Sequence, residues 1–232
     1  MKIAVINFSG NVGKTTIARH LLAPRIERAE VISVESINAD EGQTNAIRGD
    51  QFGELQEYLQ TVDNAVVDVG ASNVEDLLAL MRRYRGSHED FDYFVIPTVP
   101  ALKQQQDTIA TLAELARLGI PASKLKVVFN LVEDGTDVKE TFDTLLAFIE
   151  ENPLTDVSTR CTLGANEIYE RVKGTDADLA ALAADQTDYK AQIARAPDTV
   201  QKVALAQKLA NRRLASGVVP ELDQCFAALE LR

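Results

Sequence analysis

A glycine-rich segment near the N-terminus constrains the fold more than any other feature. Residues 10–16 read GNVGKTT, directly after the apolar run 2–7 (KIAVIN) and directly before a helical pattern over 14–22. Glycines between a strand and a helix let successive backbone N–H groups face one anion, and the helix dipole favours the same anion. The order strand, glycine loop, GKT and helix therefore predicts a phosphate-binding loop.

The following residues alternate between strand and helix patterns. Strands are predicted near 31–36, 64–69, 92–99 and 126–132, with a weaker sixth near 157–161. Helices are predicted between them near 52–60, 73–85, 101–117 and 138–151. Because the strand runs are almost continuously apolar, both faces of the sheet should be covered. The pattern predicts an α/β fold with a doubly wound, mainly parallel sheet, and ligands at the carboxyl ends of its strands.

The C-terminal part has a different character. Residues 176–231 hold no strand candidate and predict helices that break at Pro197 and around 217–220. We therefore expect a nucleotide-binding α/β domain over 1–175 and a helical region over 176–232, packed on that domain or extending it. Within 190–213 a single acid, Asp198, accompanies six bases: Lys190, Arg195, Lys202, Lys208, Arg212 and Arg213. This stretch is either a DNA contact or the solvated face of a packing helix.

Charge and composition exclude several classes of protein. The net charge of −11 should repel nucleic acid and anionic lipid, except at a local basic patch. Two cysteines, Cys161 and Cys225, cannot form a disulfide framework and suit a reducing compartment. No apolar run reaches the 18 residues of a membrane span, and the apolar start at 1–8 is too short for a signal peptide. We expect a cytoplasmic protein without a membrane span.

The residue types of the loop predict how it would hold a nucleotide. Lys14 would reach the β- and γ-phosphates, Thr15 would place its hydroxyl on Mg²⁺, and Thr16 would bond near the α-phosphate. The backbone N–H groups around the phosphates would come from Gly10, Asn11, Val12 and Gly13. The predicted cofactors are therefore ATP or ADP with Mg²⁺.

The segment 9–16 (SGNVGKTT), the parallel layout and the later motifs resemble the deviant Walker A ATPases of the ParA/MinD type. Within that family, the chain is most similar to StbB-like plasmid stability proteins, over roughly 1–175. The family motif runs K-G-G-x-G-K-[ST]-[ST]. Ser9 stands where the family has its first, signature lysine, and Asn11 replaces a glycine. The missing lysine reaches across a nucleotide-bound dimer in relatives, so its absence implies slow hydrolysis unless Lys103 or Arg19 supplies the charge.

The resemblance also implies roles for residues outside the loop. Asp68, in VVDVG at the end of the third strand, would hold Mg²⁺ through water; the alternative is a cap for the helix that starts near Asn73. Either Asp40 or Glu35 would orient the attacking water. Asn130, in VVFNLV, would read the adenine edge, although an asparagine at a strand end is also a common turn former. The segment 161–167 would pack against the base.

The implied function is an ATP-dependent switch for plasmid stability, partition or positioning. ATP and Mg²⁺ would favour a homodimer, and weak ATPase activity, by water attack on the γ-phosphate, would release it. The implied partners are a plasmid-encoded DNA-binding protein and non-specific DNA, bound weakly through 190–213, at the plasmid or nucleoid. Two alternatives stay open: a small-molecule synthetase or kinase similar to dethiobiotin synthetase, and a nucleotide-binding adaptor that has lost hydrolysis.

Overall fold

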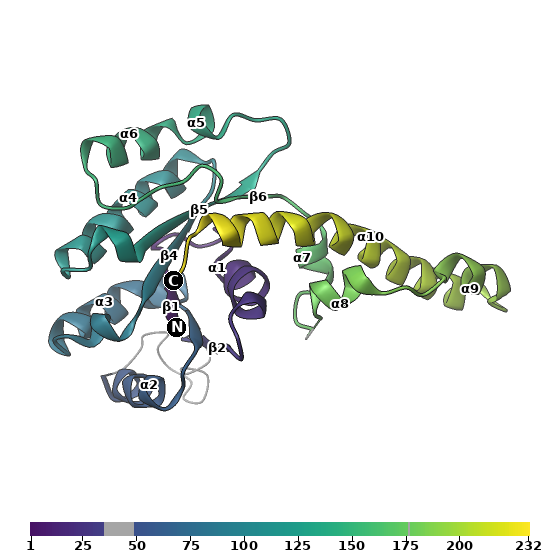
Figure 1. The fold of residues 1–232 in the computed structure, drawn as a ribbon, viewed down its shortest axis with the longest axis horizontal. Coiled ribbons are helices and arrows are strands. Elements are labelled where there is room, and N and C mark those ends of the chain that lie inside the picture. Colours follow the sequence, from purple (N-terminus) through teal and green to yellow (C-terminus); the bar gives the residue numbers. More distant parts are fainter. Residues whose placement is uncertain (35–48, 176) are drawn as a thin grey trace. The chain divides into compact units, whose positions relative to one another are not determined.

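The structure, a computed structural model, describes residues 1–34, 49–175 and 177–232 (Figure 1). The predicted water-orienting residues, Asp40 and Glu35, lie outside this described part of the chain. The chain divides into two compact units. The first holds 1–164 together with 225–232, and the second holds 165–224. No helix among the described residues is both long and apolar enough to cross a membrane.

The first unit is built on a six-stranded sheet in the order β2-β3-β1-β4-β5-β6, and every pairing is parallel. This sheet confirms the predicted doubly wound fold. Its strands are β1 (Lys2–Val5), β2 (Glu30–Ser33), β3 (Ala65–Asp68), β4 (Tyr93–Thr98), β5 (Leu125–Val132) and β6 (Thr162–Gly164).

The sixth strand lies just beyond its predicted position near 157–161. A backbone turn precedes it, because Cys161 N donates to Ser158 O at 3.0 Å. Pairing with β5 then begins at the Cys161 carbonyl, which accepts the N–H of Phe129 at 2.8 Å. Residues 158–161, which were expected to be extended, therefore form this turn.

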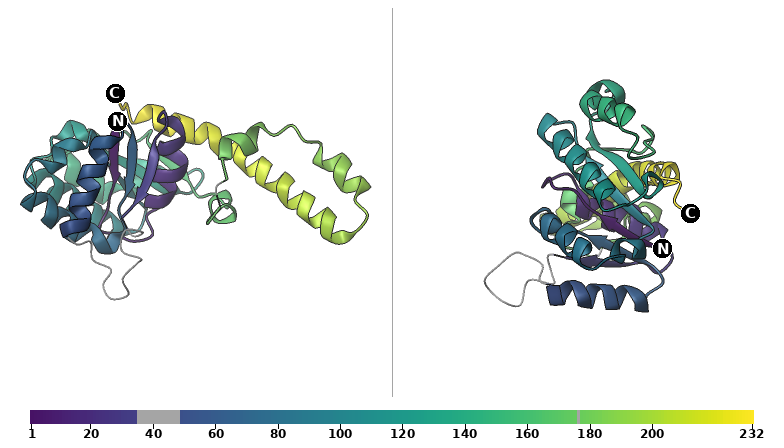
Figure 2. Two further views of the ribbon diagram at one scale, coloured as in Figure 1. Left: turned by 90° about the horizontal axis from the view of Figure 1, so that it is seen from below. Right: turned by 90° about the vertical axis from the view of Figure 1, so that its left-hand side faces the viewer.

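Helices cover both faces of the sheet (Figures 1 and 2). On one face lie α2 (Gly49–Thr61), α3 (Val74–Arg83) and α4 (Leu102–Arg117), with α5 (Val138–Thr141) and α6 (Asp143–Glu151) beside α4. The helix predicted over 138–151 is interrupted at Phe142, whose φ of −114° and ψ of 30° are not helical. The buried Phe142 ring packs 4.7 Å from the Phe129 ring, so core packing at this residue divides the helix.

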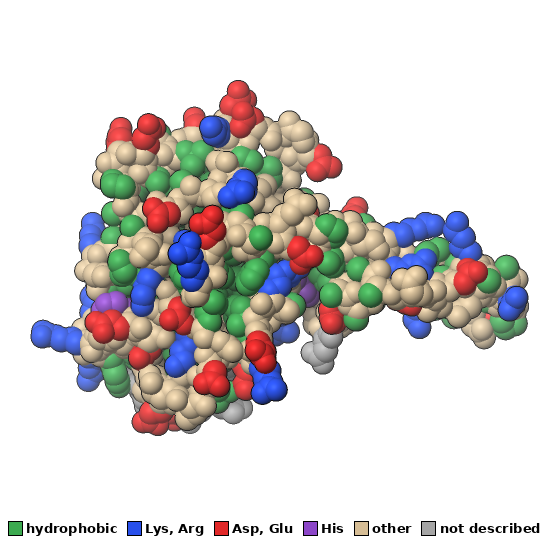
Figure 3. Space-filling view, in the orientation of Figure 1, with side chains coloured by type: hydrophobic (Ala, Val, Ile, Leu, Met, Phe, Trp, Pro, Cys, Tyr) green, Lys and Arg blue, Asp and Glu red, His purple; other side chains and the backbone are tan. Residues whose placement is uncertain are grey.

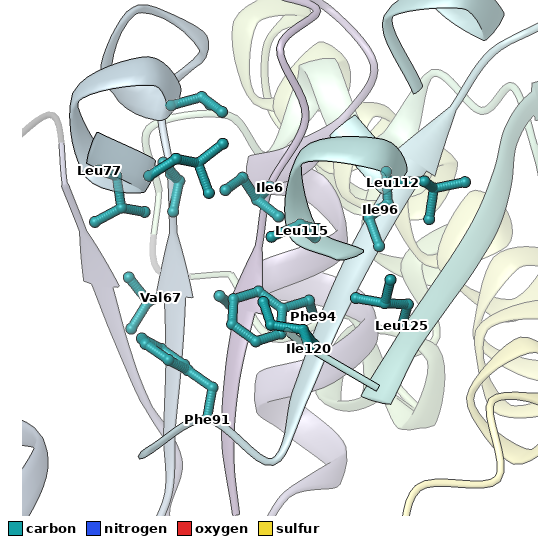
Figure 4. Close-up of a cluster of buried hydrophobic side chains, with 14 of the residues drawn as sticks. Ile6, Val67, Leu77, Phe91, Phe94, Ile96, Leu112, Leu115, Ile120 and Leu125 are labelled. Carbon is teal, nitrogen blue, oxygen red and sulfur yellow. The ribbon is translucent and has the colours of Figure 1, made fainter. Parts of the chain in front are cut away.

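The main core lies between the sheet and the α3–α4 layer (Figure 4). Alternate strand residues, including Ile6, Val67 and Phe94, meet Leu77 of α3 and Leu115 of α4 there. The intervening residues are buried as well, on the opposite face of the sheet: Ile3, Val5, Val66, Val95 and Val128. Burial on both faces accounts for the continuous apolar runs of the sequence.

The opposite face carries the first helix, which has three hydrogen-bonding patterns. It begins as α1 (Lys14–Thr16), continues as the π-helix η1 (Ile17–Leu22) and ends as the 3₁₀ turn η2 (Ala23–Arg25). Pro24 has no N–H to donate to the His20 carbonyl, four residues earlier. Nη1 of Arg25 donates to that carbonyl at 2.8 Å and to Leu21 O at 3.1 Å, so a side chain satisfies the helix end.

The second unit contains α7 (Ile168–Arg171), α8 (Leu179–Ala184), α9 (Tyr189–Arg195) and most of α10 (Thr199–Ala228). The predicted break at Pro197 is confirmed, because α9 ends and α10 begins on either side of it. The predicted break around 217–220 is wrong, since α10 runs through Pro220. Ala215, Val218 and Leu222 are buried along one side of α10, and this packing outweighs the single lost backbone hydrogen bond.

A polar cluster joins the α8–α9 turn to α10 within the second unit. Nη1 of Arg212 donates to Thr187 O at 2.6 Å and to Asp185 O at 3.2 Å, and the guanidinium lies 5.2 Å from the centre of the Tyr189 ring. Hydrogen bonds from Thr187, and then from Tyr189, lower the pKa of the Asp185 carboxyl to about 2. Arg212 thus holds the turn in place, in contrast to the other bases of the 190–213 stretch.

Candidate functional site

The glycine-rich segment forms the loop between β1 and α1, at the carboxyl end of β1. Two of its residues have left-handed backbone conformations, Asn11 with a φ of 58° and Gly13 with a φ of 87°. Asparagine tolerates this conformation better than most residues, and glycine adopts it freely. Ile17 N then donates to Gly13 O at 2.9 Å, which starts the helical hydrogen bonding. The predicted order of strand, loop and helix is present.

Asn130, from the end region of β5, packs directly onto this loop. Its side chain is buried, and Nδ2 donates to Val12 O at 2.9 Å. A Cβ atom at position 13 would overlap Nδ2 of Asn130, so only glycine leaves room for the contact. A Cβ at Gly10 would meet no atom within 4 Å. The adenine-reading role of Asn130 stays a prediction, and here its amide N–H supports the loop.

Lys14 is almost fully buried, with 8% of its surface exposed. Nζ donates to Ser9 O at 2.6 Å and to Asn7 O at 3.2 Å, so the ammonium lies against carbonyls at the start of its own loop. A buried ammonium needs such acceptors to offset the loss of water. The side chain is therefore held inside the curve of the loop.

The loop is anchored to α4 by residues that the sequence did not indicate. Asn7 is fully buried, and its Nδ2 donates to Pro97 O and to Thr108 Oγ1, both at 2.8 Å. Its Oδ1 accepts the N–H of Ser9 at 2.7 Å. Thr111 Oγ1 accepts the N–H of Phe8 at 3.2 Å. The sequence gives only weak indications of these contacts. Asn7 is a polar residue at the end of an apolar run, and Thr108 and Thr111 lie on the buried face of α4.

The two predicted metal ligands lie side by side. Thr15 Oγ1 donates to Asp68 Oδ2 at 2.6 Å, where the carboxyl ends of β1 and β3 adjoin. The residues at the N-cap positions of η4 (Ala71–Asn73) and α3, Gly70 and Asn73, make no side-chain cap hydrogen bond, and the metal-binding and capping roles of Asp68 both stay predictions. One carboxylate and one hydroxyl suit Mg²⁺, which takes its remaining ligands from phosphates and water. The described residues contain no cluster of three or more histidine, cysteine or acidic side chains that could hold a metal by themselves.

Comparison with known proteins identifies the fold. No protein-family model matches the chain, and no curated protein is similar enough to match it. Cyanothece McdA without nucleotide is 15% identical with a TM-score of 0.53, over 99% of this chain and 97% of that one. An ATP complex of a Cyanothece McdA variant is 14% identical with a TM-score of 0.52, over 99% and 94%. The MinD cell division protein of Aquifex aeolicus is 12% identical with a TM-score of 0.51, over 93% and 97%.

The chain has the fold of McdA and MinD. At these identities the likeness concerns the fold alone. The contacts that Asn130, Thr108 and Asp68 make at the loop are observed in this structure, and the comparison does not bear on them.

Three residues bear on the prediction that Ser9 replaces a signature lysine. Ser9 is 3% exposed, and its backbone lies inside the loop, bonded to Asn7 and Lys14. Lys103 is exposed at the start of α4, where Nζ pairs with Asp107 Oδ2 at 3.0 Å. Arg19 is exposed on η1. Their roles toward a second subunit stay predictions.

Two predicted features remain: the segment 161–167, expected to pack against the base, and the basic stretch 190–213. Of the segment 161–167, residues 162–164 form β6 beside β5. Burial raises the pKa of the neighbouring Cys161 thiol to about 11, so this thiol stays protonated at neutral pH. In the 190–213 stretch, Lys and Arg side chains lie on the surface along α9 and the first half of α10 (Figure 3). Apart from Arg212, the bases of this stretch are exposed: Lys190, Arg195, Lys202, Lys208 and Arg213.

Proposed function

We propose that this protein is an ATP-dependent switch that binds ATP or ADP, with Mg²⁺, at the loop 9–16. The observation that carries the proposal is the pairing of Thr15 with Asp68 beside a loop that closes on Asn130. This pairing sets a hydroxyl beside a carboxylate next to the loop, which supports a metal site there. The same fold holds ATP in the McdA variant complex, which supports a nucleotide as the ligand.

Each residue of the loop has a physical task in this proposal. Lys14 exchanges the carbonyls of Asn7 and Ser9 for the β- and γ-phosphates. Thr15 and Asp68 would hold Mg²⁺, Thr15 through its hydroxyl and Asp68 through water. Mg²⁺, when bound, neutralises charge on the phosphates. The remaining phosphate contacts come from Thr16 and from backbone N–H groups of Gly10, Asn11, Val12 and Gly13.

The reaction is attack of water on the γ-phosphate, in which positioning and charge neutralisation do most of the catalysis. Asp40, or else Glu35, orients that water, and Asn130 reads the adenine edge. Because serine at position 9 carries no charge, we expect slow turnover by the protein alone.

The biological role in this proposal is plasmid stability, partition or positioning, as in StbB-like proteins with a deviant Walker A motif. ATP favours a homodimer with nucleotide at the interface, and hydrolysis releases it. A plasmid-encoded DNA-binding protein is the partner, and the exposed bases of 190–213 add weak contact with non-specific DNA. The site belongs to the first unit, and the protein acts in the cytoplasm at plasmid or nucleoid DNA.

Nucleotide binding and phosphate release by the purified protein, with and without DNA, test this function. Lys14→Ala should weaken ATP binding at least about tenfold, because a charged hydrogen bond contributes on the order of 1.5–3 kcal/mol. Lys173→Ala, at an exposed lysine outside the proposed site, is the matched control. Turnover that requires an added acceptor would indicate a synthetase or kinase instead. ATP binding without turnover under any condition would indicate an adaptor, and equal ATP affinity in wild type and Lys14→Ala would overturn the site.

A further inference from the structure

Near its carboxyl end, β5 holds one residue more than the matching part of β6. Phe129 pairs with Thr162 and Val132 pairs with Gly164, so three residue steps along β5 match two steps along β6. An extra residue of this kind is a β-bulge, which bends the strand and turns a side chain in a new direction. The bulge includes Asn130, whose amide contacts the glycine-rich loop. It therefore lies at the edge of the sheet that carries the candidate site.

Leu131 has a backbone conformation in this bulge that leucine rarely adopts. Its φ is 56°, in the left-handed region, and no other large hydrophobic residue in the described part of the chain shares that conformation. The Cβ atom is crowded in this region, and a bulge that needs it normally has glycine there. Leucine at this position therefore costs free energy. Costs of this kind concentrate at functional sites.

The side chain of Leu131 also lies outside the core. Side chains alternate along a regular strand, so Leu131 would follow Phe129 onto the face that α3 and α4 cover. The bulge gives that place to Val132, which is 7% exposed and belongs to the core cluster. Leu131 is left 41% exposed. Folding alone gives no reason for a leucine at a position that is both strained and exposed.

The neighbour of Leu131 places it beside the loop. Nδ2 of Asn130 donates to Val12 O at 2.9 Å. An asparagine amide has two N–H groups and a carbonyl oxygen, so this bond uses only part of its capacity. Adjacent Cα atoms are about 3.8 Å apart, so the Leu131 side chain can reach a ligand that Asn130 contacts.

We propose that Leu131 is the apolar surface on which the base of the bound nucleotide lies. This inference rests on the proposed function, in which Asn130 reads the adenine edge. A purine base has a polar edge and flat apolar faces, so an amide for the edge and an aliphatic side chain for one face complement it. Ligand sites commonly combine apolar contacts with a few polar groups in this way. The base then removes the exposed part of Leu131 from water.

Two ligands that differ by the nucleoside test this contact with the full chain: ATP and inorganic tripolyphosphate, each with Mg²⁺. Leu131→Asn is the informative change, because asparagine tolerates the left-handed conformation and has a polar side chain. The affinity for ATP should fall at least about threefold, because the apolar contact with the base is lost. The affinity for tripolyphosphate, which has no base, should stay as in the wild type.

Two matched variants accompany this change. Leu131→Met keeps an apolar side chain of similar volume on the same backbone, so ATP affinity should stay within about threefold of the wild type. Arg28→Asn relieves the same kind of backbone conformation, a φ of 52°, at an exposed residue. Arg28 precedes β2, at the opposite edge of the parallel sheet, so its replacement should change the affinity for neither ligand. Circular dichroism and denaturant unfolding check that each variant folds.

A measurement on the wild-type chain does not depend on how a variant folds. With methyl-labelled leucine, the Leu131 methyl resonances can be assigned from their absence in Leu131→Met. Addition of ATP should shift them in the direction of shielding, because the methyl groups then lie over an aromatic ring. Tripolyphosphate should leave them nearly unchanged.

Failure of this inference can be told from failure of the proposed function. If the wild type binds neither ATP nor tripolyphosphate, the proposed function fails and the inference fails with it. If both ligands bind and Lys14→Ala weakens both, the phosphate site stands. The inference is then overturned if Leu131→Asn weakens neither ligand, or if the Leu131 methyl resonances do not respond to ATP. Equal weakening of both ligands by Leu131→Asn would also overturn it, since Leu131 would then support the loop through Asn130.

Discussion

At the scale of single residues, Gly13 carries the tightest constraint in the site, because a left-handed backbone and the Asn130 contact coincide there. Gly13→Ala should destabilise the protein by more than the roughly 1–2 kcal/mol expected for the backbone alone, since the methyl group overlaps Asn130. Gly86→Ala is the matched control, with a φ of 88° and open space around its Cβ. Denaturant unfolding measures both. Equal losses of stability in the two variants would show that the Asn130 side chain moves aside at little cost in free energy.

Asp68 is expected to act through the metal. Asp68→Ala should reduce Mg²⁺-dependent phosphate release much more than nucleotide binding in EDTA, because the carboxylate stands beside the Thr15 hydroxyl. Asp107→Ala, which removes a half-buried carboxylate paired with Lys103, is the control. If hydrolysis and metal-free binding fall equally, then the Asp68 carboxylate supports the loop and not the metal.

At the scale of elements, α4 holds the start of the loop after β1 through two threonines, Thr108 and Thr111. Thr111→Val keeps the shape of the side chain but removes the acceptor of the Phe8 N–H, and an unsatisfied buried donor costs about 1–3 kcal/mol. We expect that loss in unfolding experiments, together with weaker nucleotide binding. Thr61→Val, at the exposed end of α2, should change neither. Unchanged stability and affinity in Thr111→Val would separate α4 from the loop.

The elements also show what could be predicted from the sequence. The central strands were predictable because burial on both faces demands unbroken apolar runs. By contrast, β6 is a short strand after a turn, and α10 continues through Pro220 because buried neighbours support it, so local pattern misled in both places. The loop itself has a local signature. Its supports, from Asn130 and from Thr108 on α4, come from residues about a hundred positions away and leave no such signature.

At the scale of the whole molecule, the exposed bases of 190–213 must act against a net charge of −11. If they bind DNA, the logarithm of affinity should fall with the logarithm of salt by about 0.9 per phosphate neutralised. Replacement of the five exposed bases by alanine should abolish ATP-dependent binding. Arg212 must be spared, because it holds the α8–α9 turn. A salt titration with ATP and with ADP measures this, and no binding at low salt in either state would return these bases to a solvated role.

The basic stretch along α9 and α10 has a practical consequence as well. Since 190–213 carries +5, the remaining residues carry −16, so a locally basic stretch stands within a strongly acidic protein whose isoelectric point is near 4.7. Such a molecule can bind both anion- and cation-exchange resins, and in dilute buffer its opposite regions attract those of its neighbours. That attraction fades once the screening length falls to about 8 Å at physiological ionic strength. Aggregates that form in low-salt buffer and dissolve when salt is restored would therefore report charge asymmetry, and specific assembly should be measured only above that ionic strength.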